Sequence, residues 1–582
     1  MYLRNKYIRK KIAIIVGILL LGFLAVIIHL IYLMIVSSEY YQKEALELHQ
    51  RERDIKAPRG MIYDRNGIPL ADNKPVCTVS VIHSQLKEPE RVIEVLSKEL
   101  ELDPKGIQKK VEKISSREKI KSNVDRETGE RIRQYRLDGV MIDEDYKRYY
   151  PYDTLCSKVL GFTGSDNQGI VGLEVKYDEQ LQGTNGQILT LTDARGVEIA
   201  GAGEERKEPI PGNALYTSLD YNVQKYAVQA CKKVRKKKNA KSVSMVIMNP
   251  QNGEIYAMVN EPEYNLNEPF TLIENRETDH LTVKEKQNQL NRMWRNYCIN
   301  DTYEPGSTFK IVTATAALEE KVVSVNDYFS CPGFRIVEDR RIRCHKNGGH
   351  GQENFREGIM NSCNPVFIDV GLRLGTTATY KYYKRLGLFE RTGIDLPGEA
   401  NSIMHKQDNV KSVELATMSF GQSFQITPMQ LLRATSAVVN GGTLVTPHFG
   451  VKTVDETTGK EAIFTYPLKK NVVTQDTSEL MKELLEAVVA EGGGSKAAIE
   501  GYRIGGKTAT SQKLPRGNGK YISAFLGFAP ADDPAVMGLV LIEEPEGLYY
   551  GGIIAAPVIR EVFDNILPYL GLEPQLVTKE KE

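Results

Sequence analysis

One stretch near the N-terminus, Ile12 to Val36, is almost wholly apolar and sets the first constraint on the fold. It is long enough to cross a bilayer as a somewhat tilted helix. Basic residues crowd before it and mixed charges follow it, so the positive-inside bias predicts a cytosolic tail over 1–11 and an exterior position for everything after 36. A cleavable signal peptide is the alternative, but no A-x-A-like cleavage site follows Val36. We therefore expect a retained, single-pass membrane helix over 12–36.

The rest of the 582-residue chain contains no second apolar stretch of this length and is too long for one hydrophobic core. The whole chain carries 76 basic and 75 acidic side chains, a balance that gives no sign of a nucleic-acid-binding surface, so no nucleic-acid partner is expected. Seven scattered cysteines are too few for a disulfide-built scaffold. The exterior part must therefore fold around apolar cores of its own.

Residues 37–210 have the pattern of one extended module of mixed helices and strands. Asp64-Arg65-Asn66-Gly67 separates two short apolar stretches, and Asn-Gly favours the positive φ angles of a tight hairpin turn. The segment from Pro89 to Glu101 is charged and amphipathic, which predicts a helix. Glycines gather between about 160 and 215 and indicate short strands and turns.

From residue 211 the pattern becomes that of a compact domain, expected to end near 570 and to leave a tail over 571–582. Strands are predicted at both ends of this domain, and the region between them is rich in helices. The predicted strands are 242–248, 255–259, 524–529 and 536–542. This order predicts an α+β fold with one antiparallel sheet flanked by helices.

The sharpest chemical signal is Ser307-Thr-Phe-Lys310 at the start of an expected helix. Positions i and i+3 share a helix face, so the Ser307 hydroxyl and the Lys310 amine can meet. A serine hydroxyl is a poor nucleophile until a base takes its proton, and burial can lower the pKa of a lysine far enough for that role. Alone the pattern is weak, since a capped amphipathic helix with a surface lysine gives it too.

A second motif, Ser362-Cys363-Asn364, follows the first along the chain. Ser362 can relay a proton between Lys310 and a leaving amine, and Asn364 can bind a substrate amide. This pairing gives both residues a place in an acyl-transfer site.

A third motif is Lys507-Thr508, with Thr510 two residues further on. Lys507 supplies a cation for a terminal carboxylate, and the strand around it can pair with an extended peptide. The set S-x-x-K, S-D-N and K-T-G, in this order, is typical of β-lactamases and penicillin-binding proteins.

Beyond these motifs, nearly the whole chain resembles the class B penicillin-binding proteins of the division and sporulation type. The segment around Ser307 is similar to that family's nucleophile segment, and residues 59–67 are similar to the signature of its pedestal. Further matching segments are Gly169-x-x-Gly172-x-Glu174, GIDLPGE (393–399), FGQ (420–422), ITPMQ (426–430), NGG (440–442) and YGG-IIAAP (550–557).

This resemblance implies a membrane helix, a pedestal (dimerisation-type) domain and a D,D-transpeptidase domain that cross-links peptidoglycan stem peptides and is acylated by β-lactams. It also implies a polytopic glycan polymerase as membrane partner and no cofactor for catalysis. The residues to which the resemblance assigns catalysis are Ser307, Lys310 and Ser362. The residues to which it assigns substrate binding are Asn364, Lys507, Thr508 and Thr510. In place of the family's K-T-G the chain has Ala509 at the glycine position, and activity is expected to survive because Thr510 is retained.

Three other functions remain as alternatives. A penicillin sensor or scaffold would share the acylatable serine. A secreted β-lactamase would need a deacylation base, and Glu357 to Asn361 resembles that acid motif only in the wrong order. Residues 501–508 also satisfy the P-loop pattern of an ATPase, which requires a strand before the loop and a helix after it.

A cluster of cysteine and histidine residues lies between positions 331 and 363. Soft sulfur and imidazole ligands at such spacings suit zinc, and the cluster resembles that of a branch of the family with a structural zinc near the active site. A disulfide or unpaired buried thiols remain open alternatives. The candidate ligands are Cys331, Cys344, His345, His350 and Cys363.

Overall fold

The computed structural model describes residues 2–41, 50–114, 117–191, 204–273 and 281–574. The chain forms two compact units, each built from several segments of the sequence. The first unit comprises Met1–Pro58, Pro75–Lys147 and Thr184–Ile210. The second unit comprises Arg59–Lys74, Arg148–Gly183 and Pro211–Glu582. The boundaries expected near 210 and 570 stay predictions, and residues 575–582 of the expected tail lie outside the described ranges.

The first unit begins with the apolar helix expected from the sequence. Helix α1 (Tyr2–Ile31) continues into one π-helical turn, η1 (Tyr32–Val36). The stretch Lys6–Val36 has a mean hydropathy of 3.1 and buries nothing within the protein. Its length and composition suit a membrane span. Further on, a small antiparallel sheet is formed by β1 (Gln50–Ile55), β6 (Gly186–Leu191) and β7 (Glu204–Lys207).

The same unit contains a small lobe in which three helices pack on strands. Its elements are η2 (His83–Gln85), α3 (Pro89–Leu100), α4 (Pro104–Val111), β4 (Glu118–Asp125), α5 (Arg126–Gln134) and β5 (Val140–Tyr149). Helix α3 buries Val92, Leu96 and Leu100, which recur every four residues along one face. The helix predicted from Pro89 is thus confirmed, and it ends where Glu101 adopts a left-handed conformation.

In the second unit, the predicted hairpin around 64–67 joins β2 (Ile62–Tyr63) to the start of β3 (Pro69–Val81). The carboxylate of Asp64 accepts hydrogen bonds from the backbone N–H groups of Asn66 and Ile68, which closes the turn. Strand β2 pairs with β8 (Ala214–Thr217), which continues the sheet to β15 (Gly450–Val454) and β16 (Glu461–Ile463). Three short helices lie in this part of the chain: α6 (Ser157–Leu160), α7 (Gly172–Lys176) and α8 (Asp178–Leu181).

A five-stranded antiparallel sheet forms the centre of the second unit. In spatial order its strands are β10 (Ile255–Glu261), β9 (Ser242–Met248), β19 (Val536–Glu543), β18 (Tyr521–Ala529) and β17 (Gly505–Gln512). All four predicted strands are present, and strands from the two ends of the domain pair directly as β9 with β19. Strand β17 lies at one edge of this sheet, which leaves its outer side free of any neighbouring strand of the sheet.

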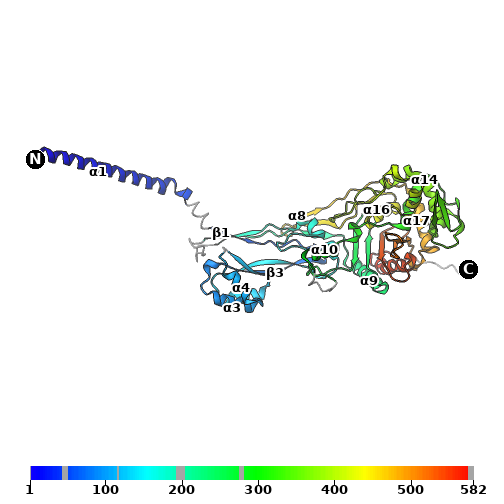
Figure 1. Ribbon diagram of the computed structural model, residues 1–582, viewed down its shortest axis with the longest axis horizontal. Helices are drawn as coiled ribbons and strands as arrows, with labels where there is room; N and C mark the ends of the chain where they lie inside the picture. Colours follow the sequence, from blue (N-terminus) through cyan, green and yellow to red (C-terminus); the bar gives the residue numbers. More distant parts are fainter. Residues whose placement is uncertain (1, 42–49, 115–116, 192–203, 274–280, 575–582) are drawn as a thin grey trace. The chain divides into compact units, whose positions relative to one another are not determined.

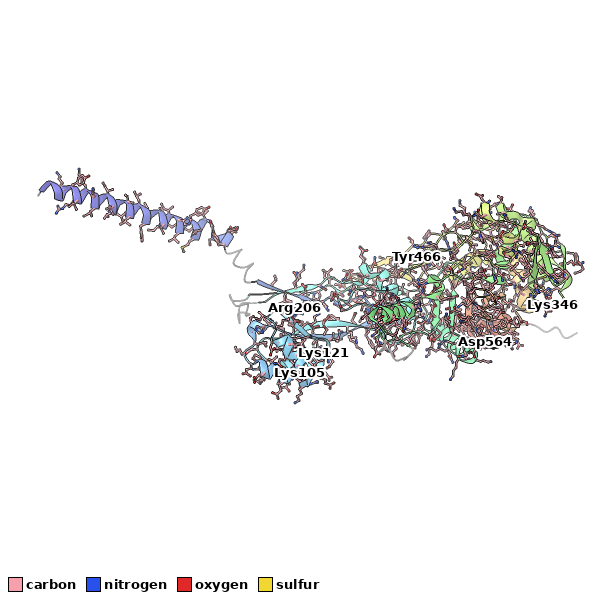
Figure 2. The ribbon with its side chains drawn as sticks, viewed as in Figure 1. Lys105, Lys121, Arg206, Lys346, Tyr466 and Asp564 are labelled. Carbon is pink, nitrogen blue, oxygen red and sulfur yellow. The ribbon has the colours of Figure 1, made fainter. Side chains whose placement is uncertain are left out.

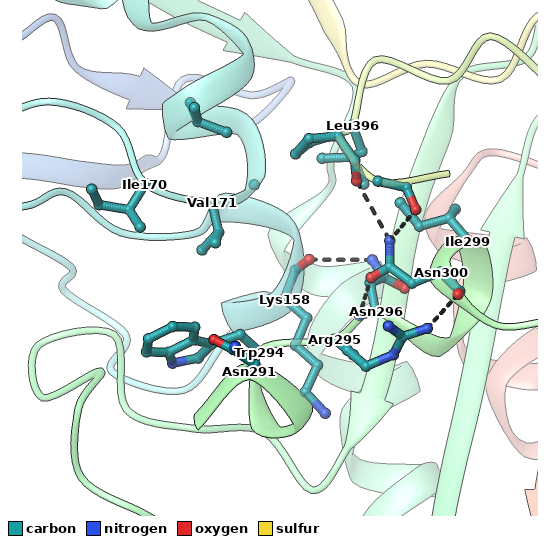
Figure 3. A pocket seen from close by; sticks show the side chains of 14 residues that line it. Lys158, Ile170, Val171, Asn291, Trp294, Arg295, Asn296, Ile299, Asn300 and Leu396 are labelled. Carbon is teal, nitrogen blue, oxygen red and sulfur yellow. Dashed lines mark hydrogen bonds between the residues drawn. The ribbon is translucent and has the colours of Figure 1, made fainter. Parts of the chain in front are cut away.

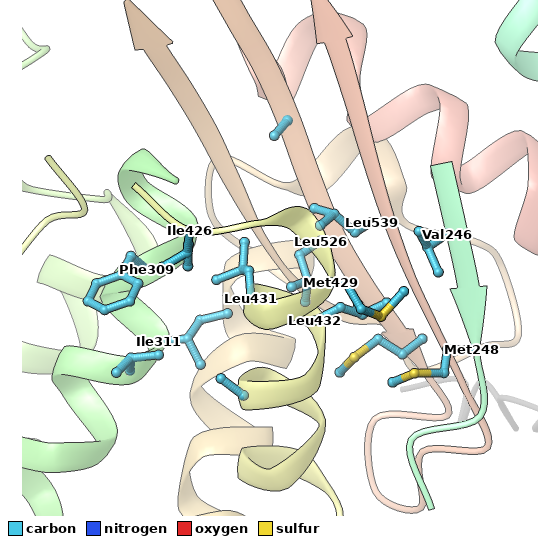
Figure 4. Packing of buried hydrophobic residues seen from close by; sticks show 14 of the residues in the cluster. Val246, Met248, Phe309, Ile311, Ile426, Met429, Leu431, Leu432, Leu526 and Leu539 are labelled. Carbon is cyan, nitrogen blue, oxygen red and sulfur yellow. The ribbon is translucent and has the colours of Figure 1, made fainter. Parts of the chain in front are cut away.

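Successive side chains of a strand point to opposite faces, so the buried strands give this sheet two apolar faces. Helices cover both of them. Met245 and Ile247 pack in a core with α9 (Tyr221–Lys238) and α19 (Ala556–Tyr569). Val246 and Met248 pack on the other face, where Figure 4 shows them beside the apolar side chains of a helix. The helices of that second core are α12 (Lys310–Glu319), α14 (Asn364–Arg385), α16 (Pro428–Val439) and α17 (Gln475–Ala490) (Figure 1). The predicted α+β fold is therefore confirmed.

Shorter elements surround the helical face, and one of them contains Ser307. The hairpin strands are β11 (Tyr328–Cys331), β12 (Phe334–Val337), β13 (Arg340–Arg343) and β14 (Gly351–Asn354). The remaining helices and turns are α10 (Val283–Met293), α11 (Tyr297–Asn300), η4 (Gly306–Phe309), α13 (Phe355–Met360), η5 (Gln407–Asn409), α15 (Ser412–Met418), η6 (Ser495–Ala497) and α18 (Gly551–Ile554).

The P-loop alternative is wrong. Its Lys507 and Thr508 lie inside β17, and the chain continues as a strand to Gln512 instead of entering a helix. A strand exposes backbone N–H groups on alternating sides, so they cannot converge on a phosphate as those of a P-loop do.

Candidate active site

Ser307 lies in the 3-10 turn η4, which leads directly into α12. Gly306 has a φ of +56°, and a Cβ there would lie 2.2 Å from Ser511 Oγ, so only glycine fits. The N–H of Gly306 donates to the carbonyl of Gly421 at 2.9 Å, and a Cβ at Gly421 would lie 2.1 Å from the Gly306 oxygen. Close backbone contact between these two glycines therefore fixes the turn that presents Ser307.

Lys310 begins α12 and is buried, with 1% of its surface exposed. Its ammonium donates to the carbonyl oxygen of Ser362 at 2.6 Å, to Ser362 Oγ at 3.3 Å and to Asn364 Oδ1 at 2.8 Å. Burial lowers the pKa of Lys310 to about 8, because desolvation disfavours the charged amine. In the described part of the chain no hydrogen bond joins Ser307 Oγ to Lys310 Nζ, and their predicted direct contact stays a prediction.

Ser362 lies in the sharp connection between α13 and α14. Its φ is +54°, an uncommon conformation for a residue with a side chain and one that recurs at functional sites. The side-chain amide of Asn364 donates to the carbonyl of Arg343 at 3.2 Å, while its oxygen accepts from Lys310. The second motif is thus held between the nucleophile helix and the hairpin that contains β13.

The third motif divides between the two sides of β17. Thr508 and Thr510 are half-buried and line the groove, and the hydroxyl oxygen of Thr510 accepts from the N–H of Gly551 at 3.0 Å. Lys507 points to the other side of the strand and is buried, with 1% of its surface exposed. Desolvation and the nearby Lys310 hold the pKa of Lys507 well below its usual range. By strand alternation Lys507 shares its side of β17 with Ala509, which also lines the groove, so its predicted contact with the substrate stays a prediction.

These elements enclose one groove of about 650 Å³. It brings together Ser307, Ser362, Asn364, Thr508 and Thr510, with Lys310 directly behind them. The sequence did not single out Gln422, Lys346, Lys496, Tyr521 or Tyr549 individually, yet these side chains also line it. The rings of Tyr521 and Tyr549 stack with their centroids 4.0 Å apart. Tyr549 directly precedes the matched YGG-IIAAP stretch, a signal that could have found it.

The predicted thiol and imidazole ligands converge beside the second motif. One ligand atom from each of four residues lies within 4.8 Å of every other, and the four residues are Cys331, Cys344, His350 and Cys363. His350 Nδ1 is 3.6 Å from the sulfurs of both Cys331 and Cys344. His345 is the one candidate outside this group, since its side chain is exposed and lines the groove. All seven cysteines of the chain lie in the described ranges and none forms a disulfide.

This arrangement fits a tetrahedral zinc site. With zinc–sulfur and zinc–nitrogen distances of about 2.3 and 2.0 Å, tetrahedral sulfur and nitrogen ligands lie about 3.6 Å apart. The measured separations agree with that value. A buried oxygen of Glu353 has no hydrogen-bond partner and lies 3.7 Å from His350 Nδ1, where a nearby cation would stabilise it. The donor set and spacing therefore suit the metal implied by the resemblance.

A second cavity, of about 450 Å³, lies elsewhere in the second unit (Figure 3). Trp294, Lys158 and Arg295 lie around it, but the two cations are already engaged. Lys158 donates to the carbonyls of Asn260 and Pro262, and Arg295 pairs with Asp301. None of the motif residues lines this cavity, so the chemistry belongs to the other groove.

Two family models match the chain. Residues 243–564 match the family described as "Penicillin binding protein transpeptidase domain". Residues 54–217 match the "Penicillin-binding Protein dimerisation domain". Together these matches span residues 54–564 except for 218–242.

Whole-length relatives agree with these matches. The chain is 37% identical to "Stage V sporulation protein D" of Bacillus subtilis (strain 168), over 100% of this chain and 89% of that relative. It is 28% identical to "Peptidoglycan D,D-transpeptidase FtsI" of Escherichia coli (strain K12), over 98% of this chain and 94% of that one. Its fold is similar to that of penicillin binding protein 2X from Streptococcus thermophilus, with a TM-score of 0.73 at 21% identity over 90% of this chain and 81% of that one. The groove and its three motifs therefore lie in a chain that belongs to the class B penicillin-binding proteins.

Proposed function

We propose that the protein is a serine-type peptidoglycan D,D-transpeptidase that acts through an acyl-enzyme on Ser307. The observation that carries this proposal is the convergence of three distant motifs on one groove, with a half-buried Ser307 in front of a buried Lys310. The names of the relatives support the activity, since one is a peptidoglycan D,D-transpeptidase.

Lys310 is placed to move the Ser307 proton through Ser362. The three acceptors around Nζ match the three N–H bonds of an ammonium, so a neutral amine must release one of them. The contact to Ser362 Oγ is the longest, and in the neutral state this hydroxyl can donate to the amine instead. With a pKa of about 8, a substantial fraction of Lys310 is neutral near pH 7.5 and can act as a base.

The acylation step then follows from the positions of the groups. Ser307 Oγ bonds to the carbonyl carbon of the penultimate D-alanine, and its proton passes toward Lys310. The bond to the terminal D-alanine breaks, and the leaving amine takes a proton from Ser362. An amine of a neighbouring stem peptide attacks the ester in the second half-reaction and releases Ser307. The start of a helix at Ser307 provides backbone N–H groups and positive potential for the oxyanion.

Strand β17 is the part of the site suited to hold the peptide. It is an edge strand, so an extended stem peptide can add to it by backbone hydrogen bonds. Thr508 and Thr510 face the groove and can donate to the terminal carboxylate, and the buried Lys507 can stabilise its negative charge. A carboxylate bound there would favour the charged form of Lys507, and that charge would in turn favour neutral Lys310.

We further propose a structural zinc held by Cys331, Cys344, His350 and Cys363. This zinc would have a structural role only. With all four coordination positions filled by protein ligands, it would stabilise the fold. Because Cys363 lies between Ser362 and Asn364, a filled site would also fix the second motif.

The membrane arrangement is also a proposal. Basic residues before the apolar helix favour a cytosolic N-terminus and an exterior catalytic domain. The helix buries none of its apolar surface within the protein, which supports contact with lipid and with a polytopic glycan polymerase. The names of the relatives support a place in septal or spore cell-wall synthesis.

Labelling with a fluorescent penicillin tests the proposed nucleophile. Wild-type protein should become covalently labelled, and Ser307→Ala should not; equal labelling of both proteins would refute the assignment. A purified cross-linking assay on lipid-linked glycan chains then separates an enzyme from a penicillin sensor. The enzyme produces cross-linked stem peptides, whereas a sensor is labelled but produces none.

A further inference from the structure

The catalytic groove has a one-sided charge that the acylation chemistry does not use. Among the described residues that line it, none is an aspartate or a glutamate. Two lysines line it instead, Lys346 in the loop after β13 and Lys496 in η6, and both are exposed. Figure 2 labels Lys346 at the surface of the second unit. The groove therefore presents positive charge to whatever enters it.

Both lysines are uncommitted. Within the described ranges neither ammonium lies within 4.0 Å of a carboxylate, in contrast to Lys381, Lys452 and Lys513, which each pair with a glutamate. A lysine without an intramolecular partner keeps its full charge available for a ligand.

The two lysine-bearing segments both adjoin the Ser362 side of the groove. The Arg343 carbonyl, three residues before Lys346, accepts from Asn364 at 3.2 Å. The N–H of Gly493, three residues before Lys496, donates to the carbonyl of Met360 at 3.4 Å. Gly493 also lies close to Gly552, next to Thr508. Lys346 and Lys496 thus flank the route that leads away from Ser307 past Asn364.

A stem peptide must follow that route. Its terminal carboxylate takes the Thr508 and Thr510 positions and its scissile carbonyl lies at Ser307, so the residues before D-Ala-D-Ala extend past Asn364. Those residues carry the other carboxylates of a stem peptide, which are either free or converted to carboxamides. Only the free form gains from two unpaired ammonium groups.

We propose that Lys346 and Lys496 bind a second, free carboxylate of the donor stem peptide and make the enzyme select acidic stems over amidated ones. The inference rests on the proposed transpeptidase function and specifies its substrate class. Two solvent-exposed ion pairs together should raise kcat/KM for the carboxylate form about tenfold over the carboxamide form, and this preference should fall in high salt.

The test uses the full-length protein and two synthetic pentapeptides that differ only in a carboxylate or carboxamide on the residue before D-Ala-D-Ala. Release of D-alanine gives kcat/KM for each peptide. We expect wild type to favour the carboxylate peptide about tenfold, and the Lys346→Gln/Lys496→Gln double variant to have a ratio near one. Lys470→Gln, an exposed lysine outside the groove, should keep the wild-type ratio.

The charge-reversed variant Lys346→Glu/Lys496→Glu should invert the preference, an outcome that misfolding cannot produce. Equal kcat/KM values for the two peptides in wild type, or an unchanged ratio in the double variant, would overturn the inference alone. Absence of acylation at Ser307 by both peptides and by penicillin would instead overturn the proposed function.

Discussion

The two sides of the catalytic groove are held in place by different physical means. On the nucleophile side, Phe309 is fully buried and packs edge-on against Phe424 and Tyr383 at 4.6 and 5.2 Å. On the other side, Cys363 is equally buried but faces two thiols and an imidazole, whose atoms lie within 4.8 Å of one another.

The two sides therefore differ in what stabilises them. Apolar packing is complete once the chain folds, because its stability comes from the area removed from water. A buried cluster of thiols and imidazole satisfies few hydrogen bonds by itself and is most stable with a cation at its centre. The Ser307 side is therefore set by folding alone, whereas the Ser362 side would also depend on the proposed zinc.

The largest effect on acylation should come from a substitution of Lys310, which belongs to the nucleophile side and contacts Ser362 and Asn364 on the other. Lys310→Met removes the base but fills the same space, so acylation by penicillin should fall by roughly 10³- to 10⁴-fold. Thermal stability should stay equal or rise, because a buried amine is replaced by an apolar side chain. Stopped-flow acylation and circular dichroism melting measure the two quantities; a loss below tenfold would show that Lys310 is not the base.

The pH profile of acylation tests the same amine without a mutation. Lys310 must be neutral to accept a proton, so the acylation rate should rise with pH and level off above about 8. Between pH 6 and the plateau the rise should be about 100-fold, since the neutral fraction changes by that factor. The profile is measured with penicillin from pH 6 to 9. A rate that stays flat over this range would contradict the assigned pKa.

The nucleophile side should respond to geometry alone. Gly306→Ala places a Cβ 2.2 Å from Ser511 Oγ at a positive φ, so the Ser511 side chain or the turn must shift and acylation should fall roughly 10- to 100-fold. Gly459→Ala is the matched control, because Gly459 also has a positive φ but has no atom within 4 Å of its Cβ position. If both variants acylate at the same rate, the close contact under Ser307 has no role.

A substitution in the cysteine cluster on the Ser362 side should have the smallest effect on the acylation rate but a clear effect on the zinc content. Cys331→Ser lies outside the motifs, so acylation should fall only about tenfold while bound zinc is lost and the melting temperature drops. Cys156→Ser, at an equally buried cysteine outside the cluster, should retain the zinc content of wild type. Metal analysis and melting curves check this. Wild-type protein that contains no zinc after purification in its presence would remove the proposed distinction between the two sides.

Much of the site was accessible from sequence because local chemistry encodes it. The turn at Asp64, the helix from Pro89 and the four strands follow from periodicity and turn residues within one short segment. Ser307 and Lys310 lie within one turn of each other, so their role in one site could be predicted without knowledge of the rest of the chain.

Other features depended on contacts between distant segments. Strand alternation places Lys507 and Thr508 on opposite sides of β17, but only the packing of distant segments buries Lys507 and leaves Thr508 half-buried in the groove. Likewise Cys344 and His345 are adjacent candidate ligands, and only the fold decides that Cys344 belongs to the group of four while His345 stays exposed. Local sequence determined the apolar helix, the three motifs and the individual strands, because each of them rests on neighbouring residues. Tertiary structure alone decided burial and direction, because these depend on which segments meet across the core.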